Sequence, residues 1–259
     1  MAEYYLMLKE LMKSGKELGF LQEFFVKFYQ AFIEKDRWLQ YLEGMGTTLL
    51  VTALALAIGV ILGVIVAVIR TSHDQQRPGT GNVFGRILLG IANWICKIYV
   101  TIIRGTPMMV QMLIMGMVIF KTSRELTAIG ALTLGINSGA YVAEIIRGGL
   151  MSLDPGQAEA SRSLGLNYID TMWFVVIPQA FKAILPSLGN EFIILLKDTS
   201  LITVIGGKEL LDAAQGIYNR TYEQMFPLIG IAIMYLILVM VFSWLQGILE
   251  RRLRQSDRR

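Results

Sequence analysis

The stretch TTLLVTALALAIGVILGVIVAVI, residues 47–69, contains no charged side chain and is followed by Arg70. As a helix it is long enough to cross the hydrocarbon core of a bilayer, which takes roughly 20 apolar residues. Gly59 and Gly63 stand four residues apart and so lie on one face of that helix. Small residues at this spacing let a neighbouring helix approach closely. The stretch therefore predicts a membrane-spanning helix with a glycine face for packing.

The remainder of the 259-residue chain follows the same pattern. It is 54% hydrophobic and only 17% charged, whereas a soluble domain has about 25% charged residues. The charges gather between long apolar runs, and these runs predict four further spans, at 106–120, 126–146, 181–205 and 226–248. The run 87–104 is interrupted by Asn93, Lys97 and Arg104, so we expect it to lie along the membrane surface and lead into the next span. The chain is thus predicted to be an all-α, polytopic membrane protein with about five transmembrane helices.

The basic residues indicate the orientation, because cytoplasmic loops carry an excess of Lys and Arg. Five spans place the termini on opposite sides, and a cytoplasmic C-terminus puts thirteen basic residues inside (Arg70, Arg77, Arg86, Lys97, Arg104, Arg147, Arg162, Lys182, Arg251, Arg252, Arg254, Arg258 and Arg259). The outer loops then carry four (Lys121, Arg124, Lys208 and Arg220). We therefore expect the basic tail, residues 249–259, in the cytoplasm and the N-terminus outside.

The N-terminal arm, residues 1–43, does not follow the rule for charge, since its six basic residues fall on the outer side beside seven acids. It lacks the apolar core of a cleaved signal peptide. Apolar side chains recur in it at helical spacing: Leu18, Leu21, Phe24, Phe25, Phe28 and Phe32. This pattern favours an amphipathic helix at the membrane surface. A sixth span through residues 18–33 is the alternative, and Glu23 and Lys27 count against it.

Several classes of function are disfavoured by composition. With Cys96 and His73 as its single cysteine and histidine, the chain has no internal disulfide and no Cys and His cluster for zinc. His73 lies in a polar loop, where a solvated side chain is a better interpretation than a catalytic base. The net charge of +4 is explained by basic cytoplasmic segments rather than by nucleic-acid binding.

The polar segment after the third span carries strong local signals. Asp154-Pro155-Gly156 is a helix start with proline in the first turn. We expect a short helix over 157–163, a stop at Gly165 and a second short helix over 167–174. Two short helices joined at a glycine form a rigid knob, and its small residues would let a partner protein close over it. An ordinary polar loop is the alternative.

This segment resembles the EAA motif of ABC importer permeases. The resemblance rests on Glu159-Ala160-Ser161, then Gly165, with Ile177-Pro178 and Leu185-Pro186 downstream. Ser161 stands where the family usually has a second alanine. The resemblance implies that a coupling loop, about residues 148–180, enters a cleft on a separate ATP-hydrolysing subunit. It implies ATPase-coupling roles for Asp154, Gly156, Glu159, Ala160, Ser161 and Gly165.

Four further runs are similar to the branch of these permeases that imports polar amino acids: 104–107 (RGTP), 137–141 (NSGAY), 189–193 (GNEFI) and 197–201 (KDTSL). The similarity extends over a permease domain of residues 44–248. It implies the type I ABC importer permease fold in a bacterial plasma membrane. It also implies three partners, namely the ATPase subunit, a second identical or related permease subunit and an extracytoplasmic solute-binding protein.

The energy source is expected to lie in the partner. The sequence has no GxxxxGK[ST] phosphate loop, and Gly206-Gly207-Lys208 is followed by Glu209 where Ser or Thr is required. ATP and Mg would therefore be bound by the ATPase subunit. We expect this chain to be neither an enzyme nor a binder of cofactor or metal.

Polar residues inside the spans are candidate substrate-binding residues, because ionisable groups there are costly and face an interior or a water path. They are Glu144, Asn190, Glu191, Lys197 and Asp198. The spacing of seven between 190 and 197, and between 191 and 198, puts each pair on related helix faces. Acids, an amide and a lysine suit both ends of a zwitterion. Structural pairing is an equally good interpretation for each, and for Glu144 the candidate partner is Arg147.

Three other classes remain as alternatives. An ion-coupled secondary transporter of amino acids would often show an internal repeat, which residues 47–120 and 126–248 do not share. A membrane scaffold or sensor would not need Glu191 and Lys197 inside a span. A membrane enzyme is disfavoured by the single His and single Cys.

Overall fold

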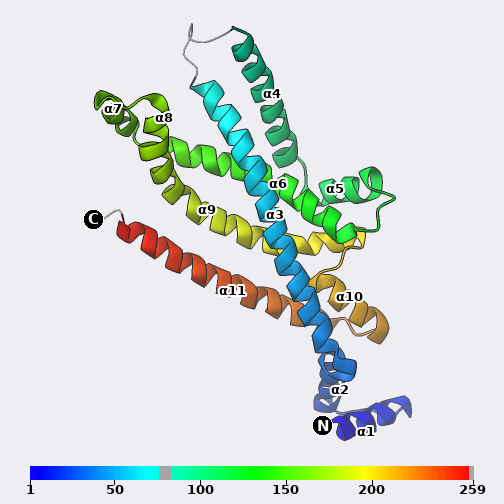
Figure 1. Ribbon diagram of the computed structural model, residues 1–259. Helices are drawn as coiled ribbons and strands as arrows, with labels where there is room; N and C mark the ends of the chain where they lie inside the picture. The colour runs from blue at the N-terminus through cyan, green and yellow to red at the C-terminus, as the bar shows by residue number, and fades with distance from the viewer. Residues whose placement is uncertain (76–82, 257–259) are drawn as a thin grey trace.

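The computed structural model describes residues 1–75 and 83–256, and the regular elements of these residues are all helices (Figure 1). Five helical runs are long and apolar enough to cross a membrane. They are built on α3 (Arg37–Asp74), α4 (Val83–Gly105), α6 (Leu126–Met151), α9 (Ile177–Asp198) and α11 (Met225–Ser256). The shorter helices are α1 (Ala2–Lys13), α2 (Phe20–Phe32), α5 (Met108–Leu113), α7 (Pro155–Ser163), α8 (Tyr168–Thr171) and α10 (Leu210–Thr221). The predicted all-α fold with five spans is therefore confirmed.

The second span was predicted at the wrong place. Residues 83–105 form one continuous helix of 23 residues, α4, which is long enough to cross. Residues 108–119, which we expected to span, form only a short apolar helix. Asn93, which seemed to interrupt the run, is buried against the bundle with 3% of its surface exposed. Arg104 lies at the end of α4, and extended backbone at Pro107 separates this helix from α5.

Helices α3 and α6 form the centre of the bundle, where they cross (Figure 1). Both helices contribute glycines to the contact. Gly59 and Gly63 of α3 lie against Ser138 and Val142 of α6, so that a Cβ at Gly63 would stand 2.6 Å from Cγ1 of Val142. In return, Gly135 and Gly139 of α6 lie against Ile58 and Leu62 of α3. The predicted glycine packing face of the first span is confirmed.

This close contact makes Gly63→Ala destabilising. The added methyl group meets Val142 and the backbone nitrogen of Ala143, and overpacking of this kind costs about 1–3 kcal/mol. We expect a lower melting temperature of the detergent-solubilised chain than for the wild type. Gly46→Ala in the same helix is the matched control, since its Cβ would meet nothing within 4 Å. Equal melting temperatures for the two variants would contradict the packing described here.

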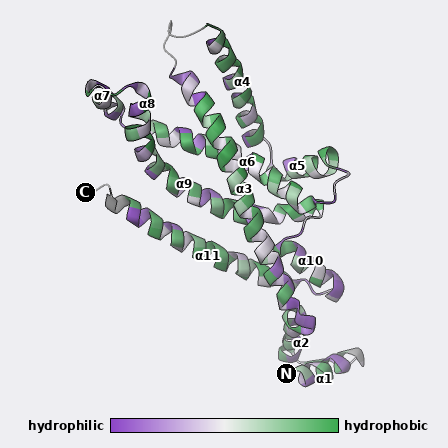
Figure 2. Cartoon of the chain, in the orientation of Figure 1, coloured by the Kyte–Doolittle hydropathy of each residue, from purple (hydrophilic) through white to green (hydrophobic). Residues whose placement is uncertain are grey.

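Hydropathy follows the architecture. Hydrophobic residues cover α3, α4 and α11 for most of their length, while hydrophilic residues gather at α7 and α8 and around α10 (Figure 2). Residues 1–43 contain the hairpin of α1 and α2, and α3 begins within this range at Arg37. Helix α2 has 13 residues, fewer than the roughly 20 that a span needs. A sixth span through residues 18–33 is therefore not formed.

Candidate translocation site and coupling surface

Three of the polar motifs meet where α4, α5, α6 and α9 come together. Ser138 of α6 donates a hydrogen bond of 2.7 Å to the carboxylate of Glu191 in α9. Its neighbour Asn137 donates to the side-chain oxygen of Gln111 at 3.0 Å, and Gln111 donates to the carbonyl and the hydroxyl of Thr106 at 3.1 Å and 2.8 Å. The motif regions at 104–107, 137–141 and 189–193, far apart in sequence, thus form one polar cluster within an apolar bundle.

The four polar residues of α9 divide into an outward and an inward pair. Asn190 and Lys197 are exposed on the surface of the chain, whereas Glu191 is 6% exposed and Asp198 is half-buried. Because α9 is continuous from Ile177 to Asp198, the spacing of seven keeps each pair on one side, as predicted. The outward pair supplies an amide and an ammonium group, and the inward pair supplies two carboxylates.

Helix α4 adds a cation and an aromatic ring near this cluster. The guanidinium of Arg104 lies over the ring of Tyr141 in α6, 5.3 Å from its centre. Tyr99 of α4 donates a 2.5 Å hydrogen bond to the carbonyl of Ile136. These contacts hold the end of α4 against α6, next to Asn137 and Ser138.

Glu144 lies apart from the cluster, toward the end of α6 that leads to α7. Its carboxylate forms ion pairs with Arg70 of α3 and with Arg147, the latter at 3.5 Å. The predicted contact of Glu144 with Arg147 is therefore present. With two guanidinium groups on its carboxylate, Glu144 ties α6 to α3, which favours the structural interpretation for this residue.

The knob after α6 begins as expected with a short helix, α7, that ends at a glycine. The second short helix expected over 167–174 is not separate, because α8 continues through the π-helical stretch Met172–Val176 into α9. The carboxylate of Asp154 accepts a hydrogen bond of 2.9 Å from the backbone nitrogen of Gly156 and so caps α7. Gly165 ends α7 with φ +90°. The backbone nitrogen of Leu166 reaches the carbonyl of Ser161 and that of Gly165 reaches Arg162, the bond pattern of a Schellman motif.

The residues predicted to couple to the ATPase lie mostly on the outside of this knob. Asp154, Gly156, Glu159, Ala160 and Gly165 are exposed. Ser161 is 5% exposed, and its hydroxyl donates to the carbonyl of Gln157 at 2.7 Å, so it packs inside the knob.

Apolar side chains on the knob were not singled out from the sequence. Leu164 and Ile169 are 85% and 74% exposed, and Tyr168 lies between them in sequence and is 55% exposed. The signal was available, since these are apolar residues in an otherwise polar segment. A cleft of about 930 Å³ separates the knob from the end of α3, with Gln75 and Arg162 among its lining residues. The knob therefore offers a partly apolar surface beside a cleft.

A buried carboxylate, Glu209, was also missed. It is 1% exposed and caps α10 by accepting bonds from the backbone nitrogens of Leu211 at 2.6 Å and Asp212 at 3.1 Å. Its other oxygen accepts from Tyr235 of α11 at 2.5 Å and from Thr48 of α3 at 3.3 Å. Burial raises the pKa of the Glu209 carboxyl, and the bonds that it accepts work against this shift. The residue joins three helices through one side chain.

The run that imitates the end of a phosphate loop is thus a turn between two helices. Gly206 has φ +87° and ends the short 3-10 segment Thr199–Ile205, and Glu209 starts α10. Within the described part of the chain, no group of three or more His, Cys, Asp or Glu is arranged to hold a metal ion.

These features define a class. A bundle of five candidate spans with a polar cluster inside it and a capped helical knob at one end is typical of a membrane-spanning transport subunit. Residues 79–255 match the family described as "Binding-protein-dependent transport system inner membrane component", and the chain belongs to this family. It is an ABC importer permease and a multi-pass protein of the inner membrane.

Relatives and solved structures agree with this assignment. The chain is 36% identical over 190 residues, 66% of this chain and 85% of the relative, to the putative glutamine transport system permease protein of Rickettsia bellii. It is 37% identical to the arginine transport system permease protein of Bacillus subtilis, over 63% of this chain and 76% of the relative. A crystal structure of an amino acid ABC transporter with histidines has a TM-score of 0.72 and 39% identity, covering 82% of this chain and 94% of that one. An inward-facing methionine ABC transporter shares the fold, with a TM-score of 0.67 over 85% and 98% of the two chains.

Proposed function

We propose that this chain is the membrane-spanning permease through which a polar amino acid enters the cell, driven by ATP hydrolysis in a separate subunit. The observation that carries the proposal is the placement of Asn190 and Lys197. Both are exposed on the surface of the chain, yet they belong to the span over residues 168–205. An ammonium group facing lipid at this depth is costly. A water-filled path, closed on its other side by a second protein, removes that cost.

The second protein is proposed to be another permease subunit, identical or related. Five spans are few to enclose a path, and the polar face of α9 is open on this chain. Two such faces opposed across a shared path would place lysines, amides and carboxylates around one substrate. Such a substrate has an ammonium group for the carboxylates of Glu191 and Asp198 and a carboxylate for Lys197 and Asn190.

The substrate class comes from these residues together with the relatives. Curated relatives are named for glutamine and for arginine transport. Both amino acids carry a zwitterionic backbone and a polar side chain. We infer that a polar amino acid binds beside α9, and that Ser138 positions Glu191 for it.

Coupling is proposed to pass through the knob. The exposed residues of α7, with Leu164 and Ile169 beside them, would enter a cleft of the ATPase subunit, which binds ATP and Mg. A solute-binding protein would deliver the amino acid on the opposite side of the membrane. The knob, the end of α11, the end of α3 and the start of α4 then share the cytoplasmic side.

The charge distribution supports this orientation after the second span has been moved to α4. Lys97 now lies inside a span and Arg104 at its outer end. With the six basic residues of the N-terminal arm left out of the count, as before, eleven basic residues lie inside against five outside. A cytoplasmic C-terminus still follows from the excess of Lys and Arg. The N-terminal arm is accordingly placed outside.

Uptake by proteoliposomes tests the proposal. We would reconstitute the chain with its candidate ATPase, paired permease and binding protein, and supply a panel of labelled amino acids. Lys197→Met is expected to lower kcat/KM for the transported amino acid roughly 10- to 100-fold, because a hydrogen bond to a charged group contributes about 1.5–3 kcal/mol. Glu191→Gln and Asp198→Asn are expected to act in the same direction.

Lys208→Met is the matched control, since Lys208 is exposed outside the spans. The substrate site is disproved if Glu191→Gln and Asp198→Asn both leave uptake rate and affinity unchanged. Uptake that proceeds without ATP would instead identify an ion-coupled secondary transporter. If no amino acid is taken up, the proposal that the substrate is a polar amino acid is wrong.

A further inference from the structure

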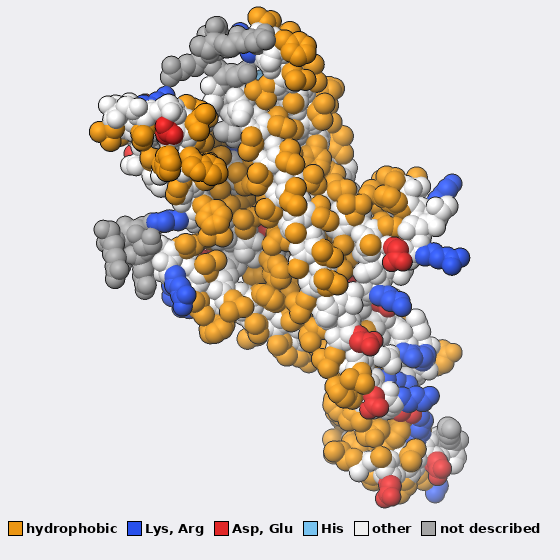
Figure 3. All heavy atoms as spheres, in the orientation of Figure 1, with side chains coloured by type: hydrophobic (Ala, Val, Ile, Leu, Met, Phe, Trp, Pro, Cys, Tyr) orange, Lys and Arg blue, Asp and Glu red, His pale blue; other side chains and the backbone are white. Residues whose placement is uncertain are grey.

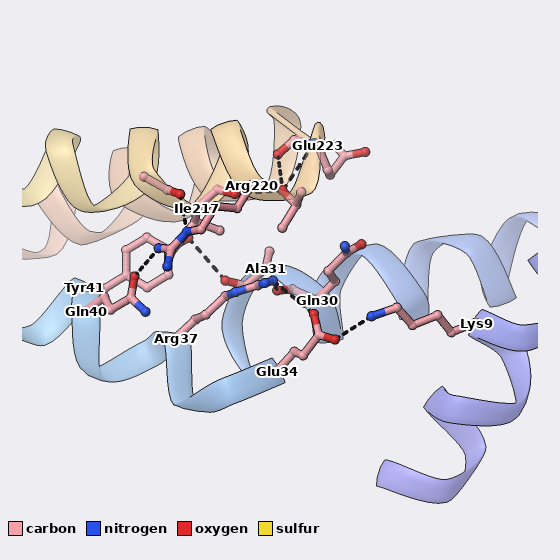
Figure 4. A network of polar contacts seen from close by, with 12 residues as sticks. Lys9, Gln30, Ala31, Glu34, Arg37, Gln40, Tyr41, Ile217, Arg220 and Glu223 are labelled. Atoms are coloured by element: carbon pink, nitrogen blue, oxygen red, sulfur yellow. Dashed lines mark hydrogen bonds and ion pairs between the residues drawn. The ribbon is translucent and has the colours of Figure 1, made fainter. Parts of the chain in front are cut away.

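The N-terminal arm, residues 1–43, contains α1, α2, the 3-10 turn Glu34–Asp36 and the start of α3, and its side chains form specific contacts (Figure 4). The rings of Tyr5 in α1 and Tyr29 in α2 stack with their centres 4.4 Å apart. Leu8 is fully buried between the two helices, in one cluster with Tyr5 and Val26. Lys9 pairs with Glu34 at 2.5 Å, and Glu34 also pairs with Arg37 at 3.2 Å. The two helices therefore form a fixed hairpin.

The arm is fastened to the transport bundle through α2. The ring of Phe24 meets Phe226 of α11 edge to face at 4.9 Å, and Lys27 pairs with Glu223 at 3.3 Å. The hydrogen bond of Lys27 with Glu23, and to a smaller extent that with Glu223, raises the pKa of the Lys27 ammonium. Arg220 of α10 donates a 2.6 Å hydrogen bond to Gln40 at the start of α3. The arm is thus held beside the link between α10 and α11.

One face of α2 carries exposed apolar side chains. Phe20 and Leu21 are 80% and 79% exposed, and Phe24 and Phe28 are 48% and 41% exposed. The spacing of four residues from 20 to 24 to 28 keeps the three phenylalanines on one face of the helix, and Leu21 lies about 20° beyond Phe28 around the same face. Hydrophobic side chains cover one side of the arm, while charged side chains gather along the other (Figure 3).

This apolar face continues onto the surface of a membrane span. Phe226, which the rings of Phe24 and Phe28 contact, lies in the first turn of α11. The exposed side chains of α11 that follow include Ile229 and Ile233, each 52% exposed. Because α11 is a candidate span, its exposed apolar face is one of the surfaces of the chain that suit contact with lipid. The face of α2 extends that surface beyond the end of the span.

We propose that the apolar face of α2 binds the lipid bilayer and that the arm is an interfacial anchor. Phe20, Leu21, Phe24 and Phe28 lie between the headgroups and the first carbons of the acyl chains. The paired charges of Lys9 and Glu34 remain on the side that faces water, while Lys27, next to Phe20 and Phe24 around the helix, is paired with Glu223 at the edge of the apolar face. An amphipathic helix with aromatic and leucine side chains on one face has this preference for the interface. Because α2 contacts Phe226 and Glu223, an arm bound to the bilayer also holds the link between α10 and α11 in place.

Depth-dependent fluorescence quenching tests the proposal on the full chain with its partner subunits in nanodiscs. In a Cys96→Ala background, Leu21→Cys and the matched control Gln22→Cys are each labelled with an environment-sensitive nitrobenzoxadiazole dye. Gln22 is exposed and adjacent but points about 100° away around the helix. Lipids carry a nitroxide quencher either at the headgroup or in the upper acyl chain. We expect quenching at position 21 that is several-fold stronger than at position 22, from both lipid positions.

Equal or absent quenching at the two positions would overturn the proposal. So would loss of quenching at position 21 when the binding protein is added, because the face would then be a protein docking surface. A disulfide between two Leu21→Cys chains would identify an interface between permease copies and would also overturn it. Phe20→Cys serves as a second variant if the label at position 21 prevents assembly. None of these outcomes depends on which amino acid is transported.

Discussion

Replacement of Glu209 by alanine is expected to lower the free energy of unfolding by about 2–4 kcal/mol. Loss of the helix cap of α10 accounts for about 1 kcal/mol. The hydroxyls of Tyr235 and Thr48, which both donate to Glu209, are left without an acceptor, and such buried groups cost about 1–3 kcal/mol. Because α3, α10 and α11 meet at this side chain, we expect the substitution to weaken the packing of all three helices. Thermal unfolding in detergent, followed by size-exclusion chromatography, measures it.

Two further variants make this prediction specific. Glu209→Gln keeps one oxygen acceptor and the volume of the side chain, so its melting temperature is expected between those of the wild type and Glu209→Ala. Asp212→Ala removes a carboxylate from the first turn of the same helix, where its contribution is about 0.3–1 kcal/mol. A melting temperature of Glu209→Ala equal to that of Asp212→Ala would show that the buried bonds add nothing to stability.

The sequence predicts those parts of the fold that depend on local signals. Long apolar runs identify α3, α6, α9 and α11, because only helices of that length satisfy their backbone inside a bilayer. The knob follows from Asp154, Pro155 and Gly165, which act within one helical turn of where they stand. For α4 the same reasoning failed. Asn93 counts as polar in a sliding count, whereas in the folded chain it turns toward the bundle and is buried.

The contacts across the bundle could not be read in this way. Ser138 and Glu191 are 53 positions apart, and Thr48 and Glu209 are 161 apart, so nothing in either local pattern relates them. Glu209 also departs from the usual choice of helix cap, which is Ser, Thr, Asp or Asn. The spacing of seven in α9 did predict which residues share a side. It could not predict which side faces outward, because that depends on the packing of α6.

The second large effect is expected at Gly165, where valine should abolish most ATP-driven uptake while asparagine should retain it. Gly165 has φ +90°, and a Cβ at this position would meet nothing within 4 Å, so the cost of a side chain comes from the backbone alone. A left-handed conformation costs an ordinary residue about 1–2 kcal/mol, and a β-branched residue adopts it least readily. Asparagine is the residue that most often replaces glycine at this position of a helix end.

Valine at position 165 therefore disfavours the backbone conformation in which the two Schellman hydrogen bonds end α7, and the orientation of α7 relative to α8 changes. A cost of about 1–2 kcal/mol lowers the ratio of native to altered joints roughly 5- to 30-fold, and uptake should fall by up to that factor. Two measurements separate coupling from folding: retention of the ATPase subunit on immobilised permease, and the melting temperature of the isolated permease. Because α7 and α8 lie at the periphery of the bundle, we expect the ATPase to be lost while melting changes little. If Gly165→Val transports as well as Gly165→Asn, the joint between α7 and α8 does not carry the coupling.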